Sequence, residues 1–371
     1  MSGSSIGKLF SVTTWGESHG SAVGVTIDGC PANLLLSESQ IQQYLNRRRP
    51  GQSEFTTSRK ETDHAELLSG VFQGKTTGTP LSFIIRNTDH HSKDYNELSA
   101  VFRPGHGDYT YQAKYGIRDY RGGGRSSGRE TVGRVAAGAV AVLLLKELGV
   151  TLTAFTKAIG PIDIPTEKYF FKEISNNLLY MPNTDYADKA KTYLQEVRQK
   201  GDSCGGVIEC IVEGMPTGVG EPVFDKLDAR LAAAVMSIGG VKSVEFGDGI
   251  KAAGSLGSQN NDQFTARDNQ IQKESNHSGG VLAGISDGSP LIVRVGVKPT
   301  PSIAVPQNTV TNEGKMCTLS THGRHDPVIV PRAVVVVEAM VAITLVDLLL
   351  QNMGSRLDYL KQIYHCSHNF F

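Results

Sequence analysis

The sequence contains 371 residues, and its 37 lysines and arginines balance 37 aspartates and glutamates, so the formal net charge is zero. This length suffices for one large domain or two medium ones, and the lack of a basic excess argues against a nucleic-acid-binding protein. Five cysteines without a CxxC pair favour reduced thiols in the cytoplasm. The N-terminal residues lack the apolar core of a signal peptide, and the most apolar stretch, 333–350, is interrupted by Glu338 and Asp347. We therefore expect no membrane partner and interpret this stretch as a buried helix.

The first elements predicted along the chain are two short strands, at 9–14 and 22–27, joined by a glycine-rich turn. A helix should follow, because Ser37 and Gln40 have capping-box spacing before apolar residues at helical intervals. Further helices are expected at 127–147, 186–200, 224–237 and 331–352, and further strands at 206–212, 241–246 and 291–297. Residues 253–280 are polar and glycine-rich, so we expect a mobile loop that orders over bound ligands.

An internal repeat links the two parts of the sequence. GESHG at 16–20 and GDSCG at 201–205 each begin a predicted strand, and an amphipathic helix follows each strand at the same spacing. The repeat predicts two related halves, at about 7–150 and about 192–350, within a single domain over 1–371. The expected fold is α+β, a layered β-α-β sandwich built from two related halves. A Rossmann fold is not expected, because no GxGxxG follows a strand and opens a helix.

Basic residues are concentrated in two segments of this neutral chain. They are Arg47, Arg48, Arg49, Arg59 and Lys60 in the first segment, and Arg103, Lys114, Arg118, Arg121, Arg125, Arg129 and Arg134 in the second. Such local clusters favour a pocket for a small anion, although a solvated basic face would have the same composition. Residues 125–129, RSSGR, combine arginines and hydroxyls before a predicted helix, as phosphate sites do.

Two histidines are candidates for proton transfer. His19 lies in the first glycine-rich turn, and His106 lies between Gly105 and Gly107. Glycine lets the backbone approach a ligand closely, and histidine carries protons near neutral pH; a merely exposed turn histidine is the alternative. His322 and His325 flank Arg324, but no further cluster has zinc-like spacing, so we expect no metal site.

Five segments, in order along the chain, resemble motifs of the chorismate synthase family. They are GESHG at 16–20, RPGHGDY at 103–109, RGGGRSSGRET at 121–131, KPTPS at 298–302 and GRHDP at 323–327. The resemblance covers about residues 7–350. It implies a lyase of the shikimate pathway that converts 5-enolpyruvylshikimate 3-phosphate to chorismate by 1,4-anti elimination of the C3 phosphate and a C6 hydrogen. It also implies reduced FMN as cofactor, NADPH only indirectly for flavin reduction, and a cytoplasmic homotetramer.

The resemblance also implies roles for individual residues. His19 would protonate the leaving phosphate, His106 would hold a proton near the reduced flavin, and Asp326 would act near flavin N5 in proton abstraction. The implied substrate-binding residues are Ser18, Arg48, Arg103, Ser127, Arg129 and Arg324. The implied cofactor-binding residues are Arg48, Arg125, Ser126, Ser127, Gly239, Gly240, Ala283, Lys298, Pro299, Thr300, Pro301, Ser302 and Arg324.

Two departures from the family pattern bear on nucleotide binding. Gly239 and Gly240 stand where asparagine and alanine are common, which removes a side-chain contact. Glu54 stands where an arginine is frequent and cannot bind an anion, although Arg59 is close enough in sequence to compensate. Two alternatives stay open: a flavin oxidoreductase that consumes NADPH, and a noncatalytic anion- or nucleotide-binding module.

Overall fold

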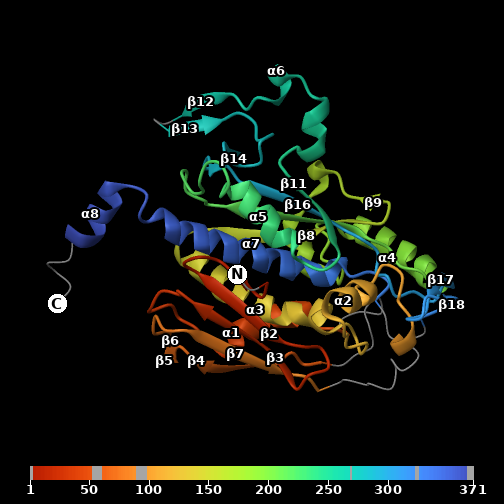
Figure 1. The fold of residues 1–371 in the computed structure, drawn as a ribbon. Coiled ribbons are helices and arrows are strands. Elements are labelled where there is room, and N and C mark those ends of the chain that lie inside the picture. Colours follow the sequence, from red (N-terminus) through yellow and green to blue (C-terminus); the bar gives the residue numbers. More distant parts are fainter. Residues whose placement is uncertain (1–2, 52–60, 89–97, 268–269, 322–325, 366–371) are drawn as a thin grey trace.

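The structure is a computed structural model, and it describes residues 3–51, 61–88, 98–267, 270–321 and 326–365. Two five-stranded antiparallel sheets enclose a layer of helices (Figure 1). The first sheet has the order β1 (Ser5–Ile6), β2 (Ser11–Gly16), β3 (Ala22–Asp28), β7 (Leu81–Arg86), β4 (Ala65–Ser69). The second has the order β11 (Val241–Phe246), β16 (Leu291–Val297), β10 (Gly206–Glu213), β8 (Thr151–Ile159), β9 (Ile162–Asp163). The predicted α+β, layered β-α-β fold is therefore confirmed.

The helix layer consists of α1 (Glu38–Arg48), α3 (Thr131–Glu147), α5 (Leu227–Met236) and α7 (Val330–Asn352). The structure confirms the capping box of α1, because the Ser37 side chain accepts a hydrogen bond from the Gln40 N–H and the Gln40 side chain binds the Ser37 N–H. Helices α3 and α7 cross closely, since a Cβ atom on Gly138 would lie 2.5 Å from the Cα atom of Ala339. Only glycine fits at this crossing.

The most apolar helix, α7, is long and apolar enough to cross a membrane, but 83% of its most apolar window is buried. That is the environment of a core helix between two sheets. The facing strands show the period-2 burial expected of a sheet with one covered face, as in β16, where every second residue from Leu291 to Val297 is buried.

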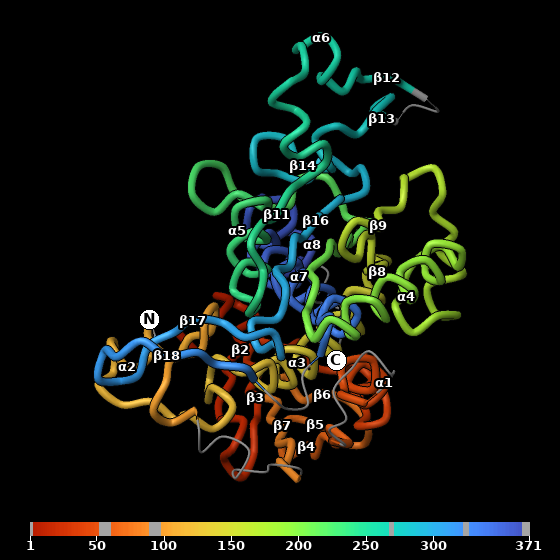
Figure 2. The backbone as a smooth tube through the Cα atoms, turned by 90° about the vertical axis from the view of Figure 1, so that its right-hand side faces the viewer, coloured from red at the N-terminus to blue at the C-terminus, as the bar shows by residue number. Residues whose placement is uncertain are grey.

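The helix expected at 127–147 begins later than predicted. Residues Gly124–Ser126 and Gly128–Glu130 form two short 3-10 turns, and α3 starts at Thr131. Ser127 has an extended backbone and its side chain accepts a hydrogen bond from the Arg129 N–H, so it separates the two turns. A further helix, α2 (Asp108–Tyr115), was not expected from the sequence. The hairpin of β17 (Gln307–Val310) and β18 (Met316–Leu319) lies beside α2 (Figure 2). Val101, which precedes α2, pairs with Thr311 in the turn of this hairpin.

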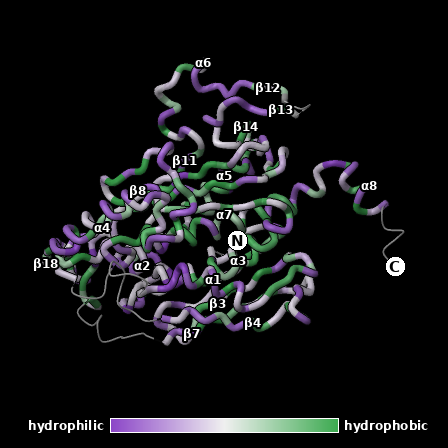
Figure 3. Tube along the Cα trace, turned by 180° about the vertical axis from the view of Figure 1, so that it is seen from behind, coloured by the Kyte–Doolittle hydropathy of each residue, from purple (hydrophilic) through white to green (hydrophobic). Residues whose placement is uncertain are grey.

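The polar segment 253–280 has its own secondary structure. It contains α6 (Gly257–Asn260) and the hairpin β12 (Phe264–Arg267) and β13 (Gln270–Lys273), which project beyond the second sheet (Figure 1) and are largely hydrophilic (Figure 3). The side chain of Lys273 is 3% exposed, and its ammonium group lies 3.2 Å from Asp262 and 2.7 Å from Asp287. None of the described residues of this segment lines the cavities described below, and the expected ordering over bound ligands stays a prediction.

The two sheets have matching strand orders. In the first, β2, β3, β7 and β4 are adjacent, and in the second β8, β10, β16 and β11 occupy the same relative places. A small hairpin precedes the third strand of each set, β5 (Val71–Phe72) with β6 (Lys75–Thr76), and β14 (Val281–Leu282) with β15 (Ile285–Ser286). This correspondence supports the proposed duplication. On this correspondence a second half would begin with β8, near residue 151, rather than near 192.

Candidate active site

A cavity of about 650 Å³ lies where loops from both halves meet. Among the predicted site residues, its walls include Ser18, Arg48, Arg103, His106, Arg125, Ser126, Ser127, Arg129, Gly239, Gly240, Lys298, Pro299, Thr300, Pro301, Ser302 and Asp326. A neighbouring cavity of about 1050 Å³ shares five wall residues with it: Tyr111, Arg125, Glu130, Arg134 and Ser237. Both volumes suit small-molecule ligands.

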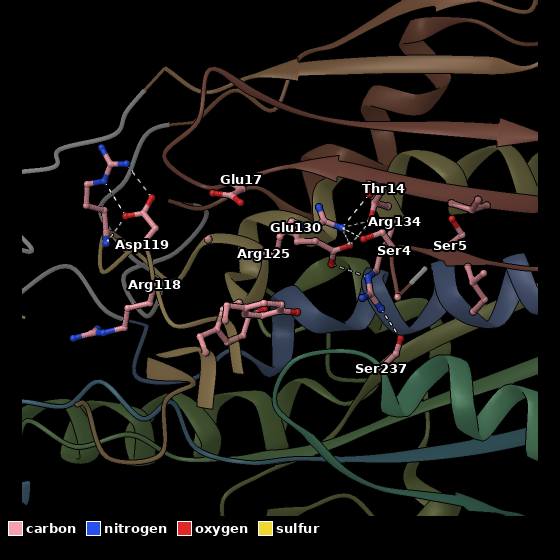
Figure 4. Close-up of a pocket in the computed structure, with 18 of the residues that line it drawn as sticks. Ser4, Ser5, Thr14, Glu17, Arg118, Asp119, Arg125, Glu130, Arg134 and Ser237 are labelled. Carbon is pink, nitrogen blue, oxygen red and sulfur yellow. Dashed lines mark hydrogen bonds and ion pairs between the residues drawn. The ribbon is translucent and has the colours of Figure 1, made fainter. Parts of the chain in front are cut away.

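The wall between the two cavities is held together by hydrogen bonds (Figure 4). Arg125 donates to the carbonyl oxygens of Gly16 and Thr14, each at 3.0 Å. Arg134 donates to Glu130 at 2.8 Å and to the hydroxyl of Ser237 at 2.6 Å. The guanidinium of Arg125, predicted to bind the cofactor, thus donates hydrogen bonds to the end of β2, and Arg125 lines both cavities.

The two candidate histidines pack against adjacent glycines. Gly122 and Gly123 have φ angles of +70° and +89°. A Cβ atom on Gly122 would lie 2.8 Å from Nδ1 of His19, and one on Gly123 would lie 3.1 Å from Cε1 of His106. Glycine is therefore needed at 122 and 123 for two reasons. It readily adopts the positive φ angles, and its missing side chain leaves room for the imidazoles. This is the physical reason for the RGGGRSS pattern.

His106 is oriented by a buried carboxylate. Its Nδ1 atom lies 3.0 Å from Asp108, which also accepts two hydrogen bonds from Arg103, at 2.7 and 2.8 Å. Arg118 lies 3.3 Å from the same carboxylate. Burial would raise the pKa of the Asp108 carboxyl, but the hydrogen bonds from Arg103 and His106 hold this pKa well below its usual range. Asp108 is therefore an anion at neutral pH, and its contact with Nδ1 orients the His106 ring.

Arg48 and Arg129, predicted as substrate clamps, share one buried partner. Nε of Arg48 lies 3.2 Å from Asp63, and Arg129 forms an ion pair with the other oxygen of Asp63. Burial lowers the pKa of Arg48 to about 10, with Asp63 opposing this effect and Arg332 and Arg129 adding to it. Arg48 still carries its charge at neutral pH. A second carboxylate, that of Glu61, lies 3.9 Å from Arg129. The cavity walls as a whole contain seven Lys and Arg residues against three Asp and Glu residues, and this positive excess suits an anionic ligand.

The second half supplies the opposite wall. Nζ of Lys298 donates a 2.7 Å hydrogen bond to the carbonyl oxygen of Gly105, next to His106. The hydroxyl of Thr300 donates to the carbonyl oxygen of Asp326 at 2.7 Å, and Arg332 forms a 2.5 Å ion pair with the Asp326 carboxylate. Nε of Arg332 also donates to the carbonyl oxygen of Arg48 at 3.2 Å.

Sequence reasoning missed several residues that build this site. Asp63, Asn87, Asp108 and Arg332 are partners of predicted residues, and none of them was predicted to have a role. The sequence signal for Asp108 was its place in the RPGHGDY motif. Asp63, Asn87 and Arg332 carried no signal in a single sequence, because their partners are distant along the chain.

Two of the predicted residues that the structure describes are not in the cavity wall. His19 lies directly behind Gly122, and its Nδ1 is 3.2 Å from the hydroxyl of Ser18, which does line the cavity. Ala283 lies in the β14–β15 turn, beside the end of β16 that begins at Leu291, whereas Lys298 follows the other end. Seven strand residues span roughly 20 Å, so Ala283 does not reach the cavity within one chain. Arg324 lies outside the described residues, as do Glu54, Arg59, His322 and His325.

The cavity fits a phosphorylated planar cofactor. A Cβ atom on Gly239 would have no neighbour within 4 Å, so the backbone there is open to a ligand. The hydroxyls of Ser126, Ser127, Thr300 and Ser302 and the ammonium of Lys298 line the same cavity, and such groups bind phosphate and ribityl oxygens. Among the described residues, no group of three or more His, Cys, Asp or Glu side chains is placed to hold a metal ion.

The fold and cavity define a layered α+β domain with a cationic cavity of a size that suits a small molecule. A family model described as chorismate synthase matches residues 10–350. A chorismate synthase from Agathobacter rectalis is 57% identical over 98% of this chain and 99% of its own, and one from Lachnoclostridium phytofermentans is 57% identical over 98% and 100%. A crystal structure of a chorismate synthase superposes with a TM-score of 0.76 at 33% identity, covering 97% of this chain and 98% of that chain.

The chain belongs to the chorismate synthase family. It is therefore an enzyme of aromatic biosynthesis that acts on a small-molecule substrate in the shikimate pathway, and its family implies a flavin cofactor.

Proposed function

We propose that this enzyme catalyses the 1,4-anti elimination of phosphate from 5-enolpyruvylshikimate 3-phosphate to give chorismate, with reduced FMN as cofactor. The C3–O and C6–H bonds break, a second ring double bond forms, and phosphate and a proton leave, so no net oxidation occurs. The observation that carries the proposal is the convergence of the two histidine loops, the paired arginines, Lys298 and Asp326 on one cavity. A substrate with a phosphate and two carboxylates matches the positive charge of these walls.

The cofactor would be held by Lys298 and the hydroxyls of residues 126–127 and 300–302. The chemistry that a bound reduced flavin supplies is the transient donation of an electron, returned before product leaves. Ser18 and His19 would form the proton-donating side, with the His19 ring fixed against Gly122. Nε2 of His106 would be the nitrogen that holds a proton near the flavin, because the other ring nitrogen, Nδ1, is occupied by its contact with Asp108. Asp326 would assist removal of the C6 proton, with its carboxylate oriented by Arg332.

One anaerobic assay tests this proposal. The protein is given photoreduced FMN and 5-enolpyruvylshikimate 3-phosphate, without NADPH, and chorismate and phosphate are measured. Equal release of both supports the lyase. In a parallel reaction that contains NADPH, oxidation of NADPH without phosphate release would favour a flavin oxidoreductase. Ligand binding without turnover in either reaction would favour a noncatalytic module.

We also propose that the chain forms a homotetramer in the cytoplasm. Val223 and Phe224 are adjacent in sequence and exposed by 69% and 91%, and such exposed apolar side chains favour a protein interface. The free cysteines Cys30, Cys204 and Cys210 are buried and suit a reducing compartment. Light scattering of the wild type and of Phe224→Glu would test the assembly: a tetramer that persists at micromolar concentration is expected only for the wild type.

A further inference from the structure

Asn87 connects two parts of the candidate active site. It follows β7 directly, is 8% exposed, and its backbone N–H donates to the carbonyl oxygen of Ser21 at 3.1 Å. Its Nδ2 atom donates to the carbonyl oxygens of Glu17 at 2.9 Å and Gly20 at 2.8 Å. Its Oδ1 atom accepts a 2.8 Å hydrogen bond from Nε of Arg129.

The chemistry of the partners fixes the orientation of this amide. A guanidinium only donates hydrogen bonds and a carbonyl oxygen only accepts them, so a flipped amide would face a donor with a donor and two acceptors with an acceptor. Both N–H groups and the oxygen of Asn87 are therefore used, and the side chain has one stable position.

The two segments held by Asn87 are those with proposed roles toward the substrate. Residues 17–20 form a tight turn, closed by the Gly20 N–H to the Glu17 carbonyl at 3.1 Å, and this turn carries Ser18 and His19. Arg129 lines the cavity and is held on its other side by Asp63 and by the carbonyl oxygen of Arg86 at 3.2 Å. Asn87 thus sets the position of a histidine relative to a cation that comes from a distant part of the chain.

We propose that Asn87 is a positioning residue for catalysis, which acts by fixing the His19 turn against Arg129. This inference rests on the proposed function, in which His19 donates a proton to the phosphate that the arginines help to bind. Asn87 does not itself contact the reacting atoms. A small displacement of a proton donor is enough to cost about 10²-fold in rate.

The substitution Asn87→Asp separates the two contacts. A carboxylate keeps the acceptor for Arg129 but places its second oxygen against the carbonyls of Glu17 and Gly20, so the turn is released while Arg129 stays paired. We expect kcat to fall by about 10²-fold, with the KM for the substrate changed by less than about threefold. In a His19→Ala background, Asn87→Asp should cause no further loss beyond about twofold, because the two residues act through one group.

Asn177→Asp is a matched control. Asn177 is also buried, its Nδ2 donates to two carbonyl oxygens and its Oδ1 accepts from two backbone N–H groups, but none of these partners lines either cavity. We expect this variant to lose stability and keep its turnover. If Asn87→Asp does not fold, Asn87→Ala enters the same double-mutant cycle with the same expected non-additivity.

A spectroscopic measurement keeps the inference testable if the enzyme proves to catalyse a different reaction. In protein labelled with ¹⁵N-histidine, Asn87→Asp should shift the imidazole resonances of His19 and leave those of His277 unchanged. Absence of chorismate formation by the wild type would refute the proposed function alone. Wild-type kcat in Asn87→Asp, an unshifted His19 resonance, or an equal loss in the presence and absence of His19 would each refute the role of Asn87.

Discussion

The imidazole of His19 lies so close to the backbone of Gly122 that no Cβ atom could be placed between them. A Cβ atom on Gly122 would lie 2.8 Å from Nδ1 of His19 and 3.3 Å from the hydroxyl of Ser18, and the φ angle there is +70°. The glycine at this position therefore determines where the histidine sits.

Gly122→Ala should lower turnover by about 10²-fold through displacement of His19, and should lower the free energy of unfolding by about 1–2 kcal/mol for the left-handed backbone. Gly149→Ala is the matched control, because Gly149 has a φ of +76° and an added Cβ there meets nothing within 4 Å. It should show the same loss of stability with unchanged turnover. Equal turnover in the two variants would contradict the role given to the contact.

His19→Ala and His106→Ala should each lower kcat by about 10²–10⁴-fold, the usual effect of losing a general acid or base. His277→Ala is the control. His277 lies in the polar segment 253–280, pairs with Asp248 and lines neither cavity. Steady-state chorismate formation under anaerobic conditions measures all three. Near-normal turnover in a folded His19 or His106 variant would remove that residue from the mechanism.

Asp108 should make the stability of the protein depend on pH. Its folded-state pKa is depressed by Arg103 and His106 despite burial, so the ionised carboxylate stabilises the fold at pH values above the unfolded-state pKa of about 3.9. This contribution is lost as the pH falls below that value.

Urea unfolding at pH 6 and at pH 3.5 should therefore show a smaller difference in stability for Asp108→Asn than for the wild type. Asp188→Asn serves as a control, because Asp188 forms an exposed pair with Lys191, and such pairs contribute little. A pH dependence of Asp108→Asn as steep as that of the wild type would show that Asp108 is not the responsible group.

Cys204→Ser should leave turnover within a few-fold of the wild-type value, whereas His19→Ala should not. Cys204 holds the place in the second glycine-rich segment that His19 holds in the first. Both side chains are buried, but Ser18 beside His19 lines the cavity, whereas Ser203 beside Cys204 does not. Burial, aided by Asp202, raises the pKa of its thiol to about 11, so it stays protonated at neutral pH. A folded Cys204→Ser variant without activity would overturn this division of roles.

Lys273→Met should loosen the segment that contains the β12–β13 hairpin and leave catalysis unchanged. The substitution leaves Asp262 and Asp287 buried without their cation, and removing one partner of a buried ion pair costs about 3–5 kcal/mol. Limited proteolysis should cut the variant faster between residues 249 and 287, with or without ligands. If FMN and substrate slow the cleavage of this segment, that result would support the prediction that it orders over bound ligands.

The local elements of this fold could be predicted from the sequence, and so could the membership of most of the site. Strands 241–246 and 291–297 have the predicted bounds, and the capping pair Ser37 and Gln40 gave the start of α1. These features depend on neighbours in sequence. Residues 125–129 were predicted to bind phosphate, and that stays a prediction. The positive φ angles of the preceding glycines and the two 3-10 turns that delay α3 were not predicted.

The pairing of charges could not be predicted. Nothing in a single sequence indicates that Arg48 and Arg129 share Asp63. Ion-pair partners are chosen by three-dimensional proximity, which depends on the whole fold. For the same reason the sequence does not indicate that Ala283, assigned by resemblance, lies near the end of β16 opposite to the end that Lys298 follows.

The close crossing of α3 and α7 at Gly138 and Ala339 bears on how such a protein could have arisen. Both helices are buried between two sheets, so a polypeptide with only one sheet and its helices would expose an apolar surface to water. A second copy of the same polypeptide would cover that surface. If the halves descend from one ancestor, self-association of that ancestor came before the joining of two genes, and the glycine at the crossing preserves the contact through which the two ancestral chains first met.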